Sequence, residues 1–305
     1  MKRSSIVLAG LATIAALGAA AWLASAPLSL DPAIAEAVAA PGSASAGRIV
    51  FFAGGCDSCH MSPGQSDPLR LGGGRELKTP FGSFYPPNIS PDPKDGIGAW
   101  SAQDFAHALL DGVSPSGEHY YPAFPYTSYR RMSAPDVRDL FAFLRTLPAV
   151  AGRAPPHALA FPFTLRRGLG LWKRLFLGPR AFPDAPGRDA AWKLGRYLVE
   201  GPGHCAECHS PRNMLGAILA HRRLTGGPLP EGKGKAPDLT AAGLKDWSNA
   251  DIVEALASGF TPTGDSLGGP MAATVRNTAE LPPAYREAIV DYLKSLPAGA
   301  WRPGE

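Results

Sequence analysis

Two short stretches of this 305-residue chain have the same pattern: Cys56-Asp57-Ser58-Cys59-His60 and Cys205-Ala206-Glu207-Cys208-His209. Together they use all four cysteines of the chain. A C-x-x-C pair followed at once by histidine is the signature of covalent c-type haem attachment. Each thiol can bond one vinyl group of the porphyrin, and the next residue then places its imidazole under the iron. The pattern predicts two covalently attached haem c groups, held by Cys56, Cys59, Cys205 and Cys208, with His60 and His209 as iron ligands.

Three other chemistries use paired cysteines: a structural disulfide, a thioredoxin-like redox pair and a zinc site. A redox pair needs neither the histidine that follows nor a second copy of the motif. Each pentad offers two cysteines and one histidine, which leaves a tetrahedral zinc ion one ligand short. Haem attachment is therefore the favoured interpretation of both pentads.

Other residues repeat together with the pentads. Gly47-Arg48 precedes the first pentad as Gly195-Arg196 precedes the second, and Trp100-Ser101 corresponds to Trp247-Ser248 at an offset of 147 to 149 residues. An internal repeat of this kind indicates two copies of one unit. The predicted organisation is a first copy at residues 46–150, a basic linker at residues 151–187, a second copy at residues 188–298 and a tail at residues 299–305.

Each copy carries the signals of short helices. Ser101 with Asp104, and Ser248 with Asp251, form capping boxes, and a glycine follows about three turns later in both copies. A second helix is expected to close each copy, at residues 133–147 and 282–296. Gly 35 and Pro 32 in the composition imply long irregular segments between these helices. The predicted fold class is all-α, with two tandem domains and long loops.

The amino terminus has the pattern of an exported chain. Lys2 and Arg3 precede residues 6–26, which carry no charge and are long enough to span a bilayer as a helix. Positive charge on the leading side places the rest of the chain outside the cytoplasm.

Residues 1–26 are expected to be either an uncleaved signal anchor or a cleaved signal peptide. Ala24-Ser25-Ala26 has the small-x-small form of a cleavage site. Pro27 follows directly, and the apolar run is longer than that of an ordinary signal peptide, so the anchor is favoured. Residues 27–45, rich in Ala, Pro and Ser, are then predicted to be a tether.

The formal charge of +4 is concentrated in one place: residues 151–183 hold six Lys or Arg and no Asp or Glu. This cluster is too local for a protein that binds nucleic acid. Within it, residues 161–177 mix aromatic and aliphatic side chains with basic ones. They are interpreted either as a helix packed between the two copies or as a segment resting on a membrane surface.

Several ordered motifs resemble a known family. Besides the pentads they are Asn88-Ile89-Ser90-Pro91-Asp92, Gly96-Ile97-Gly98-Ala99-Trp100-Ser101, Tyr121-Pro122-Ala123 and Ser210-Pro211-Arg212-Asn213. Over roughly residues 46–298 the chain is similar to dihaem cytochromes c, above all the cytochrome subunits of membrane-bound alcohol and gluconate dehydrogenases. The resemblance implies two tandem cytochrome c domains that pass electrons from a periplasmic dehydrogenase towards the respiratory chain.

The resemblance also places a methionine opposite the second histidine. Met271 lies 62 residues after His209, where the family has its ligand methionine, whereas Met214 is too near His209 in sequence to reach the other face. A methionine ligand raises the potential of a haem. Met271 is thus expected to be the sixth ligand of haem 2, with core packing as the alternative.

The first copy departs from this pattern. Aligning Gly112 with Gly259 puts Phe124 opposite Met271, and phenylalanine cannot bind iron. Met132, eight residues on, is the preferred sixth ligand of haem 1. The alternatives are His119 and an open, five-coordinate iron. Met61 is expected to be a surface or packing residue, and His107 to serve packing.

These ligands separate two functions. A saturated haem 1 favours an electron carrier, and an open haem 1 permits an enzyme acting on peroxide or a sulfur oxyanion. The carrier is favoured because the sequence shows no acid–base group beside an open site. The expected donor is a periplasmic or membrane-bound dehydrogenase, and the acceptor a quinone or a terminal oxidase or cytochrome. The expected location is the periplasmic side of the bacterial inner membrane, or the soluble periplasm if residues 1–26 are removed.

Overall fold

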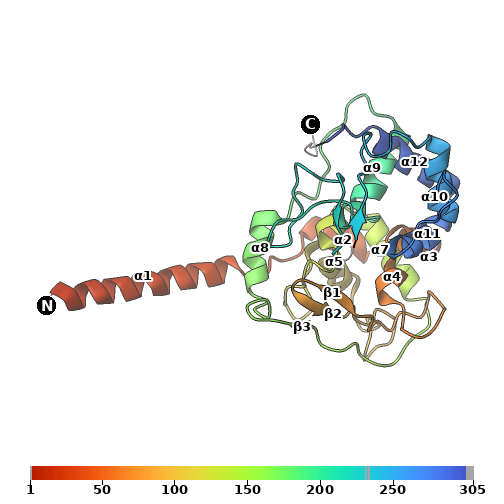
Figure 1. Ribbon diagram of the computed structural model, residues 1–305. Helices are drawn as coiled ribbons and strands as arrows, with labels where there is room; N and C mark the ends of the chain where they lie inside the picture. The colour runs from red at the N-terminus through yellow and green to blue at the C-terminus, as the bar shows by residue number, and fades with distance from the viewer. Residues whose placement is uncertain (1, 231, 233, 300–305) are drawn as a thin grey trace.

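A computed structural model describes residues 2–230, 232 and 234–299 of the chain. One long helix, α1 (Lys2–Ala24), projects from a body formed by the rest (Figure 1). Its segment Ile6–Ala24 is long and apolar enough to cross a membrane and is not buried within the molecule. A cleavable signal sequence would pass the same test. The apolar amino-terminal segment is therefore helical.

The first copy is organised around two helices that cross at a glycine. Helix α3 (Ala44–Ala53) packs against α7 (Ala134–Leu144), and a Cβ atom added at Gly47 would lie 1.8 Å from the carbonyl oxygen of Asp139. Glycine is needed because no other residue allows two backbones so close. The remaining helices here are α2 (Pro32–Ala39), α4 (Cys56–His60), α5 (Ala102–Asp111) and α6 (Tyr126–Tyr129).

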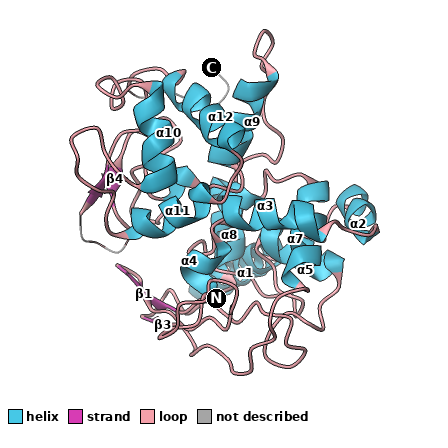
Figure 2. Cartoon of the chain, turned by 90° about the vertical axis from the view of Figure 1, so that its right-hand side faces the viewer, coloured by secondary structure: helices cyan, strands magenta, loops and turns pink. Residues whose placement is uncertain are grey.

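The second copy repeats this crossing. Helix α9 (Ala190–Glu200) packs against α12 (Pro283–Lys294), and a Cβ atom added at Gly195 would lie 1.8 Å from the carbonyl oxygen of Ala288. Between these two helices come the 3₁₀ turn η1 (Cys205–Glu207), α10 (Asn249–Ser258) and α11 (Pro270–Ala279). Figure 2 shows α9, α10 and α12 in one part of the body and α3, α5 and α7 in another.

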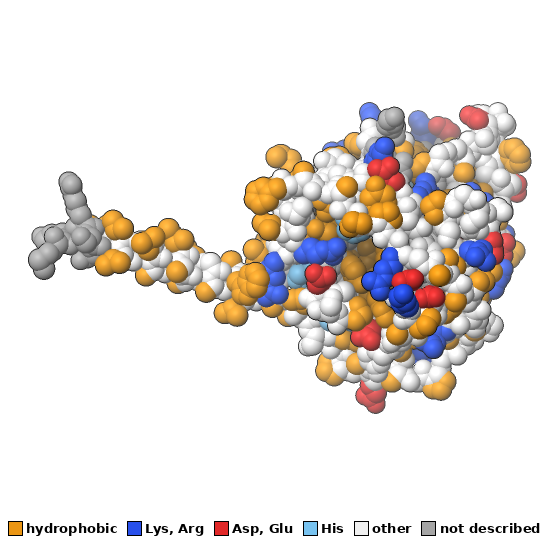
Figure 3. All heavy atoms as spheres, turned by 90° about the horizontal axis from the view of Figure 1, so that it is seen from below, with side chains coloured by type: hydrophobic (Ala, Val, Ile, Leu, Met, Phe, Trp, Pro, Cys, Tyr) orange, Lys and Arg blue, Asp and Glu red, His pale blue; other side chains and the backbone are white. Residues whose placement is uncertain are grey.

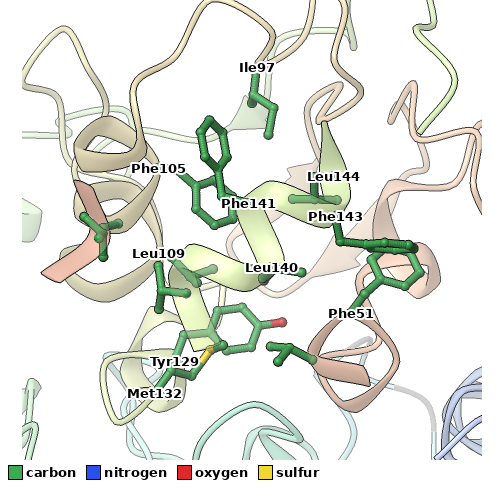
Figure 4. Close-up of a cluster of buried hydrophobic side chains, with 14 of the residues drawn as sticks. Phe51, Ile97, Phe105, Leu109, Tyr129, Met132, Leu140, Phe141, Phe143 and Leu144 are labelled. Atoms are coloured by element: carbon green, nitrogen blue, oxygen red, sulfur yellow. The ribbon is translucent and has the colours of Figure 1, made fainter. Parts of the chain in front are cut away.

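Each pair of helices carries its own hydrophobic cluster. Figure 4 shows the first cluster, in which side chains of α3, α5 and α7 converge. The second cluster is built on α9 and α12. The two clusters touch, because Leu281 belongs to the first and Tyr285 packs against both. The division at residues 46–150 and 188–298 stays a prediction.

The all-α prediction is confirmed only in part, because short strands form within the long loops. β1 (Leu77–Thr79), β2 (Gly82–Phe84) and β3 (Ala158–Leu159) make an antiparallel sheet, and β4 (Gly227–Pro228) pairs with β5 (Lys235–Ala236). The physical reason is that loop backbones must satisfy their N–H and C=O groups, and neighbouring extended segments do so by pairing. The structure is helix-rich with five short strands in the described residues.

Two segments are more structured than the sequence indicated. Residues 27–45, predicted to be a tether, contain α2, which packs on α5 and α7 and buries Val38. The predicted linker at residues 151–187 contributes β3 to the sheet, which was not expected. Its helix α8 (Gly168–Phe176) lies within residues 161–177, where a helix was one of the two interpretations. Both differences arise because scattered apolar side chains find partners only in the folded body. The predicted tail lies outside the described residues except for Gly299.

Candidate haem sites

Both pentads begin after a residue in the left-handed conformation. Gly55, before Cys56, has φ 55°, and His204, before Cys205, has φ 39°. This turn lets Cys56 pack against the first hydrophobic cluster and Cys205 against the second. Cys56 and Cys205 are free thiols, and burial raises the pKa of both. Thiols that pack against apolar side chains are suited to bonding the vinyl groups of a haem.

The two predicted iron ligands have the same environment. His60 donates from Nδ1 to the carbonyl oxygen of Pro87 at 2.8 Å, and His209 donates from Nδ1 to that of Pro237 at 2.8 Å. A carbonyl oxygen can only accept, so each Nδ1 carries the proton and each Nε2 keeps its lone pair. A hydrogen bond from the ring nitrogen that does not bind the metal fixes the orientation of a metal-ligating imidazole.

The protonation state fits as well. Burial lowers the pKa of His60 and of His209, so both imidazoles are neutral at physiological pH. Neutral imidazole is the form that binds iron. Within the described part of the chain, no group of three or more His, Cys, Asp or Glu side chains is arranged to hold a metal ion. The fit to a haem rests on the neutral imidazoles and on the paired cysteines beside them, and a haem brings its own metal.

The predicted sixth ligands differ in their surroundings. Met271 is half-buried in the first turn of α11 and is a member of neither hydrophobic cluster of the described residues. Met132 is 6% exposed and lies within the first cluster, next to Tyr129 (Figure 4). Met132 comes just before α7, where the second copy has Leu281 before α12, and Leu281 is also buried. Packing accounts for the burial of Met132, and its ligation stays a prediction.

Phe124 is part of an aromatic cluster. Its ring contacts those of Tyr120, Tyr126 and Tyr129 at centroid distances of 5.9, 6.3 and 5.7 Å. The hairpin before it confirms the alignment with Met271. Tyr120 N donates to Gly112 O, and four residues before Met271 the same bond joins Leu267 to Gly259, both at 2.7 Å.

His119, the alternative ligand of haem 1, is engaged elsewhere. Its Nε2 bonds the carbonyl oxygen of Ser25 at 2.8 Å, and its Nδ1 accepts from Lys173 Nζ at 3.1 Å. Both ring nitrogens are thus committed to the junction between α1 and the body. His107 similarly bonds the carbonyl oxygen of Leu28 at 2.9 Å. Sequence reasoning assigned His107 to packing and did not anticipate that both histidines hold the segment after α1.

The two pentads lie next to each other, a feature that sequence reasoning missed. His204 Nε2 donates to the carbonyl oxygen of Gly54 at 3.2 Å, and Tyr129 Oη donates to the same oxygen at 3.0 Å. The rings of Tyr129 and His204 are 5.5 Å apart. Gly54 is two residues before Cys56, so these bonds join the start of one pentad to the start of the other. The only hint in the sequence was a histidine where the first copy has glycine.

Two further contacts tie each pentad to the other copy. Glu207, inside the second pentad, accepts a hydrogen bond from Ser128 Oγ of the first copy at 3.0 Å. Ser58, inside the first pentad, accepts one from Asn277 Nδ2 of α11 at 3.2 Å. The reciprocal arrangement fixes the relative position of the two haem-binding segments.

Comparison with known proteins agrees with this geometry. The cytochrome c family profile matches residues 44–148. The chain is 50% identical over 303 residues to a diheme cytochrome c-type protein of Cereibacter sphaeroides, covering 98% of this chain and 99% of the relative. The chain belongs to the cytochrome c family. The resemblance to dihaem cytochromes c is confirmed, and the cytochrome is a haem-binding electron-transfer protein.

Relatives of this cytochrome include subunits of dehydrogenases. It is 36% identical to the cytochrome c subunit of alcohol dehydrogenase (quinone) from Gluconacetobacter polyoxogenes, over 82% of this chain and 55% of that protein. It is 34% identical to the cytochrome c subunit of gluconate 2-dehydrogenase from Pantoea cypripedii, over 83% of this chain and 59% of that protein. The cytochrome thus spans just over half the length of these two dehydrogenase subunits.

Proposed function

We propose that this cytochrome is a two-domain, dihaem electron carrier that accepts electrons from a dehydrogenase and passes them to the respiratory chain. The observation that carries the proposal is the repeated site: two complete pentads, each with its histidine bonded to a proline carbonyl, joined through Gly54, His204 and Tyr129. Two adjacent and equivalent sites suit passage of single electrons through the molecule.

The residues of the chain would divide the work as follows. The four cysteines would hold the haems covalently, and haem iron supplies reversible one-electron chemistry. His60 and His209 would supply the proximal ligands, oriented by Pro87 and Pro237. Met132 and Met271 would occupy the opposite positions and favour the reduced state. Saturated irons leave no position for a substrate, which sets the carrier apart from a haem enzyme.

The names of the relatives support the proposed donor. Two of the relatives are named as cytochrome c subunits of alcohol dehydrogenase (quinone) and of gluconate 2-dehydrogenase. By the same chemistry the donor here would be a periplasmic or membrane-bound dehydrogenase, and the acceptor a quinone or a terminal oxidase or cytochrome.

We also propose that α1 is retained as a membrane anchor on the periplasmic side. The candidate cleavage site around Ser25 is built into the body: Ser25 is 3% exposed, its carbonyl oxygen binds His119, and its hydroxyl oxygen accepts from Arg167 at 3.0 Å. Cleavage here would discard contacts that the fold makes. The intact mass of the purified protein should include residues 1–26.

The carrier function is tested by the spin state of the purified protein. Two low-spin haems that bind neither carbon monoxide nor cyanide are expected. A high-spin haem 1 that binds cyanide would favour the enzyme instead.

The donor is tested with membranes from cells that contain or lack the chain. Ethanol or gluconate should reduce haem c only where the chain is present, and no reduction by either would exclude these two donors.

A further inference from the structure

Helix α8 exposes apolar side chains on its outer face, whereas its lysine is buried. Leu171 and Leu175, four residues apart and therefore on one face, are 37% and 72% exposed. Lys173 is buried and donates to the carbonyl oxygens of Asp111 and Gly112, both at 2.7 Å. A helix on the surface of a water-soluble body has the opposite distribution. The outer face of α8 is thus suited to a non-aqueous neighbour.

The same helix closes the base of α1. A Cβ atom at Gly170 would lie 2.0 Å from the carbonyl oxygen of Ser25, so the two backbones are in direct contact. Arg167 donates to Trp22 O at 3.1 Å, and Arg174 donates to Ala24 O. These bonds satisfy carbonyl oxygens at the end of α1, which lack partners within the helix. Figure 1 shows α8 lying crosswise to α1 at the edge of the body. A membrane crossed by α1 would run parallel to α8.

Other exposed apolar side chains gather at this junction. Among them are Leu28, Phe161 and Leu165, and the side chain of Phe161 is 78% exposed. Figure 3 shows hydrophobic side chains where α1 meets the body, with basic side chains beside them. The loop that carries Phe161 is held in place, because Phe163 packs on Phe81 with ring centroids 4.9 Å apart and its carbonyl oxygen accepts from Tyr121 Oη at 2.8 Å.

Charge complements the apolar surface. Residues 151–183 contain six basic side chains and no acidic one, but Arg153 and Arg180 form ion pairs with Asp95 and Asp111, and Lys173 is buried. The basic side chains beside the apolar surface are therefore those of Arg166, Arg167 and Arg174. A surface that combines apolar side chains with basic ones is typical of a segment seated at the interface of an anionic bilayer. A soluble partner would not need this surface to be continuous with the end of a membrane-length helix.

We propose that α8 and the loop Phe161–Leu165 form a seating surface that rests in the headgroup region of the membrane crossed by α1. This inference rests on the proposed anchoring by α1. The surface would hold the haem-binding body against the bilayer at a fixed orientation. The loop after the second pentad would share that position, because Trp172 Nε1 donates to Leu215 O at 2.9 Å.

The test places a spin label at Leu175→Cys, Phe161→Cys or, as a control, Phe260→Cys in the full-length haem-loaded protein. Phe260 is 60% exposed and follows α10, away from α1 in Figure 1. In vesicles that contain phosphatidylglycerol, molecular oxygen should relax the first two labels more than a water-soluble nickel chelate does. The control label should show the reverse. A Leu175 label as accessible to the chelate as the control label would overturn the proposal, as would spin–spin broadening that assigns this surface to a second copy.

A second variant removes the apolar face without touching the haem sites. Leu171→Glu with Leu175→Glu should shift a label at Phe161 from oxygen to chelate accessibility, with haem content unchanged. Phe260→Glu should leave that label in lipid. Unchanged accessibility in the double variant would contradict the role of α8. The intact mass of the protein tests the anchor separately. If residues 1–26 were missing from it, the proposed anchoring by α1 would be wrong. The seating surface would then stand only if added vesicles still protected the Leu175 label from the chelate.

Discussion

The two copies cross their helices in the same way but fill the crossing with different side chains. In the first copy Phe51 packs against the rings of Phe52 and Phe143, at centroid distances of 5.2 and 5.3 Å. In the second copy Glu200 and Tyr292 occupy the places of Phe52 and Phe143. Glu200 pairs with Arg223, and Tyr292 Oη donates to Glu200 at 3.1 Å.

The comparison shows which part of the design tolerates change. The glycine at the crossing has no substitute, because a carbonyl oxygen occupies the space of its Cβ atom in both copies. The side chains packed around the crossing can be aromatic or ionic, provided that every buried charge has a partner. The loops with the predicted sixth ligands show the same contrast. Both copies keep the backbone hairpin, but the first copy has Phe124 at the position of Met271.

The largest expected effect is the loss of one haem from one copy. Replacing Cys205 and Cys208 by serine should lower the haem content from two per chain to one, because serine forms no thioether. Cys56→Ser with Cys59→Ser should do the same for the first copy. Mass spectrometry of the denatured protein measures both. A chain that kept two covalent haems after either change would show that the two copies are not equivalent attachment sites.

The next effect concerns the sixth ligands. Met271→Ala should lower the potential of one haem and let it bind carbon monoxide, because alanine leaves the iron without its thioether. Met132→Leu should turn haem 1 high-spin while preserving the packing that Leu281 provides in the second copy. Redox titration and absorption spectra check both variants. A low-spin Met132→Leu protein with an unshifted potential would show that Met132, like Leu281, only packs.

A smaller effect distinguishes the two cores. Glu200→Gln should destabilise the protein by about 3–5 kcal/mol, because it removes the charge that compensates the buried Arg223. Phe52→Leu at the equivalent place should cost about 1 kcal/mol, since it exchanges one apolar side chain for another. Denaturant unfolding gives the two free energies. Equal losses would mean that the ionic pair contributes no more than packing.

The smallest effect concerns the residue before each pentad. Gly55→Ala should cost about 1–2 kcal/mol, because alanine is strained at a positive φ. For His204→Gly the relief of strain, about 1 kcal/mol, should be offset by the lost hydrogen bond to Gly54, about 1 kcal/mol. Thermal unfolding of the two variants is the measurement. A marked loss of stability in His204→Gly would show that the contact between the pentads outweighs the strain.

Local patterns predicted much of the fold because they act over a few residues. The capping boxes at Ser101 and Ser248 form as expected, with Asp104 and Asp251 as their partners, and α5 and α10 follow them. The helix α2 was missed because its signals are weak and its stability comes from packing against α5 and α7. Strand β3 was missed for the same reason, since it pairs with β2 from within the predicted linker, far away in the sequence. The neighbouring pairs β1–β2 and β4–β5 were missed because strands of two or three residues are too short to show an alternating pattern.

The sequence by itself determined the chemistry: two pentads, their repetition, and a membrane-length segment before them. Covalent attachment requires those residue types at that spacing, so it can be identified without coordinates. The tertiary structure decided how the parts meet. It brought Gly54, before the first pentad, to His204, before the second, bonded His119 to Ser25, and set α8 across the base of α1. These contacts join residues far apart in the chain, and only the packing of the whole body brings them within hydrogen-bonding distance.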